Sequence, residues 1–400
     1  MPSAPQHREQ RRQLALIALT QVFGLSVWFS STAVVPHLIH EWHITATQAA
    51  WLSMSTQLGF AAGALSSSLS GVLDRFSPHK VLGLSALLAA ALTACFAGFV
   101  QTLIAGIAIR FLLGICFAGM YPPGLKLTAS WSLTNRARSF GLLGGCLTIG
   151  SSLPYLLGIF HDVRWQYLVL GTATACAGAG VLSLLWIRSG PFLEPRSRVG
   201  LSYAWKMFQH PGARASCVGY FGHMFELYAV WTWLPIFMMH SLGQAAMTPP
   251  LAVMVFACLG IGGFLGCTLG GVAAERLGRE RVASIALATS GLCCVLSPFV
   301  FGASPPVLML FAFVWGAAVI ADSGLFSAML SSAANQRAVG TALSVQTAVG
   351  FVITIFTIQI TPMVADAYGW KFAFPYLALG PLFAVVAVGA WQPLKRSTVE

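Results

Sequence analysis

Twelve apolar stretches, each about 20 residues long, follow one another along this chain of 400 residues. A helix of that length crosses the hydrocarbon core of a lipid bilayer and satisfies its own backbone hydrogen bonds there. Hydrophobic residues make up 57% of the chain and charged residues 8%, whereas a soluble globular protein carries about 25% charged residues. The sequence therefore predicts an all-α membrane protein with spans at residues 14–35, 47–69, 81–99, 102–125, 139–160, 167–187, 216–239, 250–272, 282–302, 306–330, 339–361 and 371–392.

Lysine and arginine are concentrated in alternate connections between these spans. With an even number of spans both termini lie on one side of the membrane, and 19 of the 22 Lys and Arg residues fall on that side. Such a bias is typical of the cytoplasmic side, so we expect both termini in the cytoplasm and the protein in the cytoplasmic (inner) membrane. The same distribution explains the net charge of +11 without a nucleic-acid partner, because the basic residues are scattered over short loops.

The two halves of the chain resemble each other. Residues 188–214 form the longest polar interval, so we predict an N-terminal six-helix bundle at 1–187, a cytoplasmic linker at 188–214 and a C-terminal six-helix bundle at 215–400. An acidic-basic pair follows the second span at Asp74 and Arg75, and another follows the eighth at Glu275 and Arg276, 201 positions later. These matches indicate a duplicated unit with pseudo-two-fold symmetry, as in transporters built from repeats.

Two motifs resemble those of the major facilitator superfamily of secondary transporters. Gly271 to Arg281 fits that family's loop G-x-x-x-[DE]-R-x-G-R-x-R, and Arg110-Phe-Leu-Leu-Gly114 is similar to its fourth-helix R-x-x-x-G motif. The resemblance implies the MFS fold, in which two six-helix bundles alternate access to a central path lined by spans one, four, seven and ten. It also implies a cytoplasmic gate between the bundles, which we assign to Asp74, Arg75, Glu275 and Arg276.

Three ionisable residues, Arg110, Glu226 and Asp322, lie well within spans. A charged side chain at the bilayer centre costs about 2.5 kcal/mol or more, so these residues should face protein or water. Arg110 is a candidate to attract an anionic substrate, and its alternative is a structural tie to a neighbouring helix. Glu226 and His223, one helical turn apart, are candidates to carry a proton or to form a satisfied internal pair. For Asp322 the alternatives are bundle contact, gating and proton coupling.

Other polar side chains complete the expected substrate site. We assign substrate binding to Arg110, Gln21, Tyr155 and Gln346, and we expect Trp28, Ser31, Gln57 and Ser151 in the same cavity. Glu226 and His223 should face Arg110 across this cavity. Trp231 and Trp233, near the outer end of their span, are interpreted as anchors at the membrane interface.

The sequence contains no signature of a metal, cofactor or catalytic site. The nine cysteines lie in apolar stretches without paired spacing and are interpreted as small buried hydrophobic residues. His37, His40, Glu41 and His43 have a spacing that a helix could present to a metal ion, but we interpret them as a polar segment at the membrane edge. The chain lacks a phosphate-binding loop and a nucleophile turn, so neither ATP-driven transport nor enzyme activity is expected.

Together these features predict a monomeric, proton-coupled secondary transporter. The preferred function is uptake of a small organic or inorganic anion by symport, in which Arg110 attracts the anion and Glu226, with His223, takes the proton. The first alternative is proton-coupled efflux of amphipathic drugs or metabolites by antiport. A membrane-embedded enzyme or receptor on a transporter scaffold is the alternative from another class, although the sequence contains no catalytic constellation for it.

Overall fold

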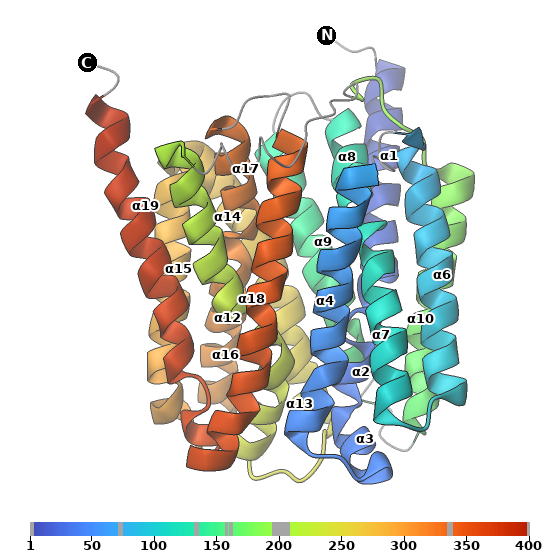
Figure 1. The fold of residues 1–400 in the computed structure, drawn as a ribbon, viewed down its shortest axis with the longest axis vertical. Helices are drawn as coiled ribbons and strands as arrows, with labels where there is room; N and C mark the ends of the chain where they lie inside the picture. The colour runs from blue at the N-terminus through green and yellow to red at the C-terminus, as the bar shows by residue number, and fades with distance from the viewer. Residues whose placement is uncertain are drawn as a thin grey trace.

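The computed structural model describes residues 4–70, 75–131, 136–156, 159, 163–193, 209–333 and 339–397, and nearly all of them are helical (Figure 1). The first half contains α1 (Ala4–Gly24), η1 (Leu25–Val27), α2 (Ser30–Ala33), α3 (Val35–Trp42), α4 (Ala46–Ser70), α6 (Pro78–Phe99), α7 (Leu103–Ala118), α8 (Tyr121–Trp131), α9 (Arg136–Leu156) and α10 (Trp165–Trp186). The second half contains α12 (Pro211–Ser241), α13 (Pro249–Val255), η3 (Phe256–Gly262), α14 (Gly263–Leu277), α15 (Arg279–Val300), α16 (Pro305–Ala321), α17 (Ser323–Ala333), α18 (Val339–Tyr368), η4 (Trp370–Phe372), η5 (Pro375–Ala378) and α19 (Leu379–Ser397).

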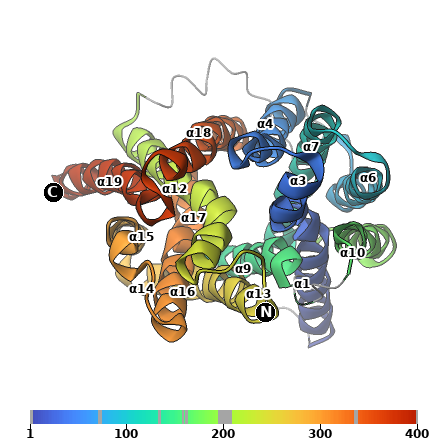
Figure 2. The ribbon, with the colours of Figure 1, turned by 90° about the horizontal axis from the view of Figure 1, so that it is seen from below.

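The helices of the two halves form two bundles that lie side by side (Figure 2). In the first half, α4 packs on α7, and α10 packs on α6 and α1. In the second half, α12 packs on α18 and α19, and α16 packs on α14 and α15. The bundles meet where α4 contacts α18 and where α9 contacts α14. The start of α1 and the end of α19 lie at the same end of the molecule, as an even number of spans requires. This arrangement confirms the predicted two-bundle architecture of twelve spans.

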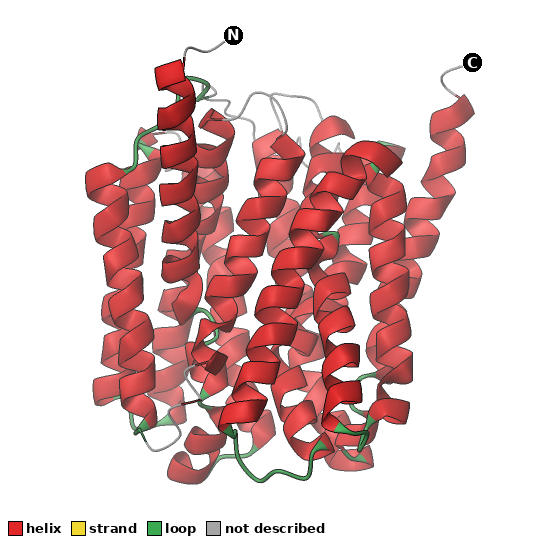
Figure 3. Cartoon of the chain, turned by 180° about the vertical axis from the view of Figure 1, so that it is seen from behind, coloured by secondary structure: helices red, strands yellow, loops and turns green. Residues whose placement is uncertain are grey.

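Eight stretches of the described residues are long and apolar enough to cross a membrane. They are Pro78–Phe99, Leu103–Trp131, Trp165–Trp186, Pro249–Leu277, Arg279–Val300, Pro305–Ala333, Ala342–Tyr368 and Trp370–Gly389. The other four predicted spans contain α1, α4, α9 and α12, which are not among these eight stretches. The described residues contain no strand (Figure 3).

Parts of two sequence predictions fall outside the described residues. Residues 194–208 of the predicted linker are among them, so the domain boundaries around 188–214 stay a prediction. Asp74 of the predicted gate also lies outside the described residues.

Three of the spans predicted to line the central path are broken near their middle. The first span is interrupted between α1 and α2, the fourth between α7 and α8, and the tenth, at Asp322, between α16 and α17. The break in the fourth span directly precedes Tyr121, Pro122 and Pro123, and proline cannot donate the backbone hydrogen bond of a continuous helix. Each break frees backbone carbonyls to accept hydrogen bonds from side chains.

The seventh span, α12, is buried along almost its whole length because α17, α18 and α19 pack around it. Trp231 and Trp233 are only 2% and 1% exposed. Trp233 donates to the Ile358 carbonyl oxygen (Nε1···O 2.8 Å), and Trp231 packs against Phe29 of the other bundle (5.5 Å between ring centroids). The prediction that these tryptophans are interfacial anchors is therefore wrong, because this part of α12 contacts protein instead of lipid headgroups.

Candidate functional site

Arg110, on α7, binds the break in the first span. Its Nε donates to Thr56 Oγ1 on α4 (3.0 Å), and its Nη1 donates to the Val27 carbonyl oxygen (3.1 Å) and Ser30 Oγ (3.3 Å). Its Nη2 donates to the Trp28 carbonyl oxygen. The two carbonyl groups can accept these bonds because the first span is interrupted beside them. Arg110 therefore ties α7 to α4 and to the first span.

The guanidinium of Arg110 carries a full charge, but its hydrogen-bond partners are all neutral. The residue is 2% exposed, and within the described ranges no carboxylate forms an ion pair or hydrogen bond with it. Four of its five N–H groups have the acceptors named above, so one N–H on Nη2 is left for a further acceptor. An anion is the group that would complete both the charge and the hydrogen bonding.

The spacing of Arg110 and Gly114 has a structural reason in the close approach of α4 and α7. A Cβ atom on Gly114 would lie 2.8 Å from the Phe60 nitrogen and closer still to the Thr56 carbonyl oxygen. Across the contact, a Cβ atom on Gly59 would lie 3.1 Å from the Gly114 Cα. Glycine at both positions therefore lets the helices touch, and this contact holds Thr56 within hydrogen-bond distance of Arg110 one turn away.

Eight buried aromatic side chains surround the break in the first span, and we call them the central aromatic cluster. They are Trp28, Phe29, Phe60, Phe117, Tyr155, Tyr228, Trp231 and Phe351. Trp28 stacks on Phe117 with ring centroids 4.3 Å apart, and Phe60 packs on Phe351 of the other bundle at the same distance. Sequence reasoning placed only Trp28 and Tyr155 in the cavity, although aromatic residues on path-lining spans were a usable signal for Phe29, Phe117, Tyr228 and Trp231.

Several buried polar atoms, in the cluster or within one helical turn of it, have no hydrogen-bond partner in the part of the chain that the structure describes. They are Trp28 Nε1, Ser31 Oγ, Gln57 Oε1, Ser151 Oγ, Trp231 Nε1 and Thr232 Oγ1. The large majority of buried polar groups in proteins are hydrogen-bonded. This set therefore offers both donors and acceptors to a bound molecule between the bundles.

The other predicted substrate-binding residues make contacts of two kinds. Tyr155 donates to the Trp231 carbonyl oxygen (3.1 Å) across the boundary between the bundles. Gln21 Nε2 donates to the Met120 carbonyl oxygen (3.2 Å), and Gln346 Nε2 donates to a backbone carbonyl oxygen of α12 (3.4 Å). Tyr155 therefore lies in the bundle contact at the cluster, whereas Gln21 and Gln346 each bind within their own bundle.

Glu226 accepts three hydrogen bonds inside the second bundle. Its Oε2 accepts from Ser290 Oγ on α15 (2.5 Å), and its Oε1 accepts from Trp315 Nε1 on α16 (2.9 Å) and from Cys294 Sγ (3.2 Å). This arrangement differs from the prediction that Glu226 faces Arg110 across a shared cavity, because each group finds its partners within its own bundle. Sequence reasoning missed Ser290 and Trp315, which lie on other helices, 64 and 89 positions away.

His223 lies against Asp322 instead of Glu226. Its Nδ1 is 2.8 Å from Asp322 Oδ1, and both side chains are 1% exposed. The two atoms are within ion-pair distance. Both Asp322 oxygens and His223 Nε2 are without a hydrogen-bond partner among the described residues. Asp322 reaches α12 because it lies at the break in the tenth span.

The predicted gate is described only in part. Arg75, Glu275 and Arg276 are exposed. At the end of the same loop motif, Arg279 Nη1 donates to a backbone carbonyl oxygen of α17 (3.1 Å) and to Ser332 Oγ (2.8 Å). The motif therefore connects the junction of α14 and α15 to α17, and the gating role of the four assigned residues stays a prediction.

The segment from His37 to His43 makes a side-chain contact with α10 and does not form a metal site in the described residues. Glu41 accepts a hydrogen bond from Trp165 Nε1 (2.6 Å), and His43 ends α3 in a left-handed conformation with φ 52°. In the described ranges, no group of three His, Cys, Asp or Glu side chains is arranged to hold a metal ion.

Eight of the nine cysteines are buried, as the sequence predicts.

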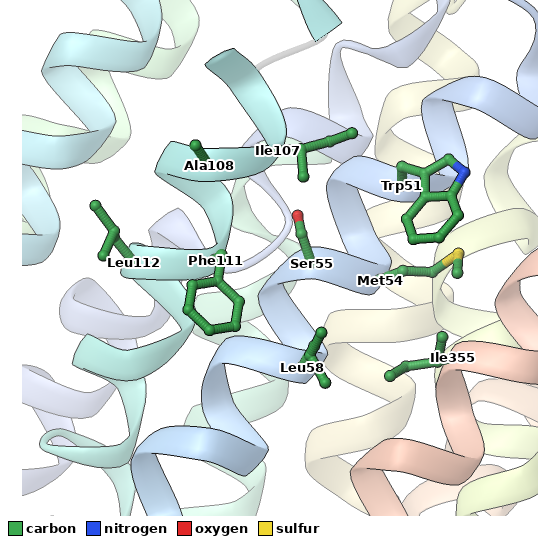
Figure 4. Close-up of a pocket in the computed structure, with 9 residues that line it drawn as sticks. All are labelled: Trp51, Met54, Ser55, Leu58, Ile107, Ala108, Phe111, Leu112 and Ile355. Atoms are coloured by element: carbon green, nitrogen blue, oxygen red, sulfur yellow. The ribbon is translucent and has the colours of Figure 1, made fainter. Parts of the chain in front are cut away.

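A pocket of about 390 Å³ lies between α4, α7 and α18 (Figure 4). Its lining residues are Trp51, Met54, Ser55, Leu58, Ile107, Ala108, Phe111, Leu112 and Ile355. Because Trp51, Leu58 and Leu112 are exposed, the pocket opens on the outer surface of the bundles and is separate from the surroundings of Arg110.

Both halves of the chain match the family described as the Major Facilitator Superfamily, over residues 16–213 and 216–400. A solved structure has the same fold, with a TM-score of 0.68 and 14% sequence identity over 97% of this chain and 96% of the other. It is a bacterial homolog of the human lysosomal transporter Spinster in an inward-facing and unoccupied conformation.

Three curated relatives are transporters by name. The niacin transporter NiaP of Acinetobacter baylyi is 23% identical over 71% of this chain and 70% of its own length. The probable sulfoacetate transporter SauU of Cupriavidus necator is 25% identical over 56% and 55%. The 4-hydroxybenzoate transporter PcaK of Pseudomonas aeruginosa is 32% identical over 42% and 38%, so the chain spans about half or less of these last two relatives. The family match over nearly the whole chain, together with the two-bundle fold, makes this protein a transporter of the major facilitator superfamily.

Proposed function

We propose that this protein takes up a small organic anion together with a proton, by alternating access between its two bundles. One observation carries the proposal: Arg110 is a buried guanidinium with only neutral partners and one N–H left over. A buried charge without a partner of opposite sign is costly, and a bound anion removes that cost.

The substrates named for the relatives support an anionic substrate, and the central aromatic cluster supports a substrate with a planar ring. Niacin, sulfoacetate and 4-hydroxybenzoate, in the names of the three relatives, each carry an acidic group that is ionised at neutral pH. Two of the three also carry an aromatic ring. Stacked aromatic side chains beside Arg110 offer such a ring a flat apolar surface, and the unpartnered indole and hydroxyl groups offer hydrogen bonds to its substituents. Small aromatic carboxylates are therefore the preferred substrates.

Proton coupling makes uptake electrically neutral for a monovalent anion. The candidates to carry the proton are the three ionisable side chains buried in the second bundle, His223, Glu226 and Asp322. We further propose that the protein acts as a monomer in the cytoplasmic membrane with both termini in the cytoplasm, where Asp74, Arg75, Glu275 and Arg276 form the gate. The distribution of lysine and arginine supports this orientation.

The test uses purified protein in proteoliposomes with an acidic exterior and an alkaline interior. Radiolabelled nicotinate and 4-hydroxybenzoate should accumulate inside, and accumulation should disappear when the pH gradient is collapsed. Arg110→Gln, which removes the charge, should abolish uptake, whereas Arg110→Lys should retain it with weaker affinity because the planar fork is lost. Arg164→Gln is the matched control, because Arg164 is exposed and lies at the start of α10. Uptake that survives in Arg110→Gln, or a wild-type protein that moves no anion, would refute the proposal.

Proton-coupled efflux of amphipathic compounds is the second candidate, and the apolar character of the central aromatic cluster favours it. The same vesicles distinguish the two directions. Export predicts that a cationic dye such as ethidium, with a large apolar surface, moves against its gradient in exchange for protons, while the small carboxylates are not accumulated.

A further inference from the structure

The two bundles contain equivalent contacts that differ in their chemistry. In the first bundle, Gln21 on α1 donates to the Met120 carbonyl oxygen (3.2 Å) at the break in the fourth span. In the second bundle, His223 on α12 lies 2.8 Å from Asp322 at the break in the tenth span. His223 follows Gln21 by 202 positions, and Asp322 follows Met120 by the same number. The repeated contact between first and fourth helix is therefore neutral in one bundle and ionisable in the other.

The two buried carboxyl groups of the second bundle are in different environments. Glu226 accepts hydrogen bonds from three donors, whereas neither oxygen of Asp322 accepts one within the described residues. A buried carboxylate without donors is unstable unless it is protonated or paired with a cation. Asp322 therefore lacks the hydrogen-bond donors that stabilise the carboxyl group of Glu226.

Several titratable side chains lie around the His223–Asp322 pair. The titratable side chains are Tyr220 and Glu226 on α12, Cys267 on α14 and, next to Cys267 and Tyr220, Tyr121 on α8 of the other bundle. Among the described residues, no lysine or arginine forms an ion pair with Asp322. His223 is therefore the partner through which the charge of Asp322 is compensated.

We infer that the His223–Asp322 pair carries the coupled proton, and that Glu226 is a structural carboxylate that holds α12 to α15 and α16. This inference rests on the proposed proton-coupled uptake and names the residues that perform the coupling. The pair binds one proton from the outer side, its net charge changes from −1 to 0, and the proton leaves on the inner side. Because Asp322 lies between α16 and α17, a change in the angle between these helices moves its carboxyl group relative to the imidazole on α12.

The experiment compares Asp322→Asn, His223→Gln and Glu226→Gln in proteoliposomes, with the better transported of nicotinate and 4-hydroxybenzoate as the probe. Counterflow measures the exchange of anion across the membrane without a net proton movement. Accumulation of the anion under a pH gradient measures the coupling of anion to proton, and a dye inside the vesicles reports the internal pH. For one proton per anion, a gradient of one pH unit supports about tenfold accumulation. We expect the Asp322→Asn and His223→Gln variants to keep counterflow but to lose the change in internal pH. The anion should then reach an internal concentration no higher than the external one. Glu226→Gln should keep the roughly tenfold accumulation and melt at a lower temperature.

Two results would overturn the inference: coupled accumulation that survives in Asp322→Asn and His223→Gln, or its selective loss, with counterflow intact, in Glu226→Gln. If Asp322→Asn does not fold, His223→Gln decides alone, because it introduces the amide that the first bundle carries at Gln21. A wild-type protein without anion counterflow is a distinguishable result, since it refutes the proposed uptake itself and this inference with it.

Discussion

Substitution of Gly114 by alanine tests whether the contact of α4 and α7 positions Arg110. Ordinary van der Waals contact begins at 3.4 Å, but the added Cβ would be 2.8 Å from the Phe60 nitrogen and nearer to Thr56. The helices must therefore separate by at least the difference of 0.6 Å. This displacement would stretch the 3.0 Å bond from Arg110 Nε to Thr56 Oγ1 beyond hydrogen-bond distance.

The expected loss of stability follows from these two effects. Overpacking costs about 1 to 3 kcal/mol, and the lost hydrogen bond of a charged group costs about 1.5 to 3 kcal/mol. The better helix propensity of alanine returns about 1 kcal/mol, so the net loss is roughly 1.5 to 5 kcal/mol. Anion uptake should fall in parallel, because Arg110 loses one of the bonds that orient it.

The assay is thermal unfolding of the purified protein in detergent, followed by tryptophan fluorescence, together with uptake into proteoliposomes. Gly178→Ala is the matched control, because Gly178 is also a helical glycine of the first bundle but has no neighbouring atom within 4 Å of an added Cβ. If Gly114→Ala unfolds at the same temperature as the wild type, or if Gly178→Ala is destabilised as much, the contact of α4 and α7 does not position Arg110.

The other ties described above give three further predictions. Thr56→Val removes the acceptor of Arg110 Nε and should lower the unfolding free energy by about 1.5 to 3 kcal/mol, with Thr56→Ser close to wild type in thermal unfolding. Tyr155→Phe removes the bond to the Trp231 carbonyl oxygen across the bundles, worth about 0.5 to 1.5 kcal/mol, so hydrogen exchange of α9 and α12 should become about 2- to 10-fold faster. Arg279→Gln removes both hydrogen bonds to α17 and should raise hydrogen exchange in α17 alone; unchanged exchange there would show that Arg279 does not hold this helix.

Much of the architecture could be predicted because a bilayer imposes a local rule on the chain. Every span must satisfy its backbone within its own helix and present enough apolar surface, so length and hydropathy identify spans one by one. The repeated acidic-basic pairs then divide the spans into two similar halves. Even the break before Pro122 and Pro123 is a local property, since it depends on the missing N–H of proline.

The partners of the buried polar residues depended on the tertiary structure. The sequence by itself determined that Arg110, Glu226 and Asp322 would be buried in a polytopic membrane protein, because their cost in lipid is a property of each side chain. It left open which atoms would meet them. Helix packing joins Glu226 to Ser290 and Trp315, and the break at Asp322 brings that residue to His223. Such pairings are set by the rotation and crossing of helices that lie far apart in the chain, and no local pattern encodes them.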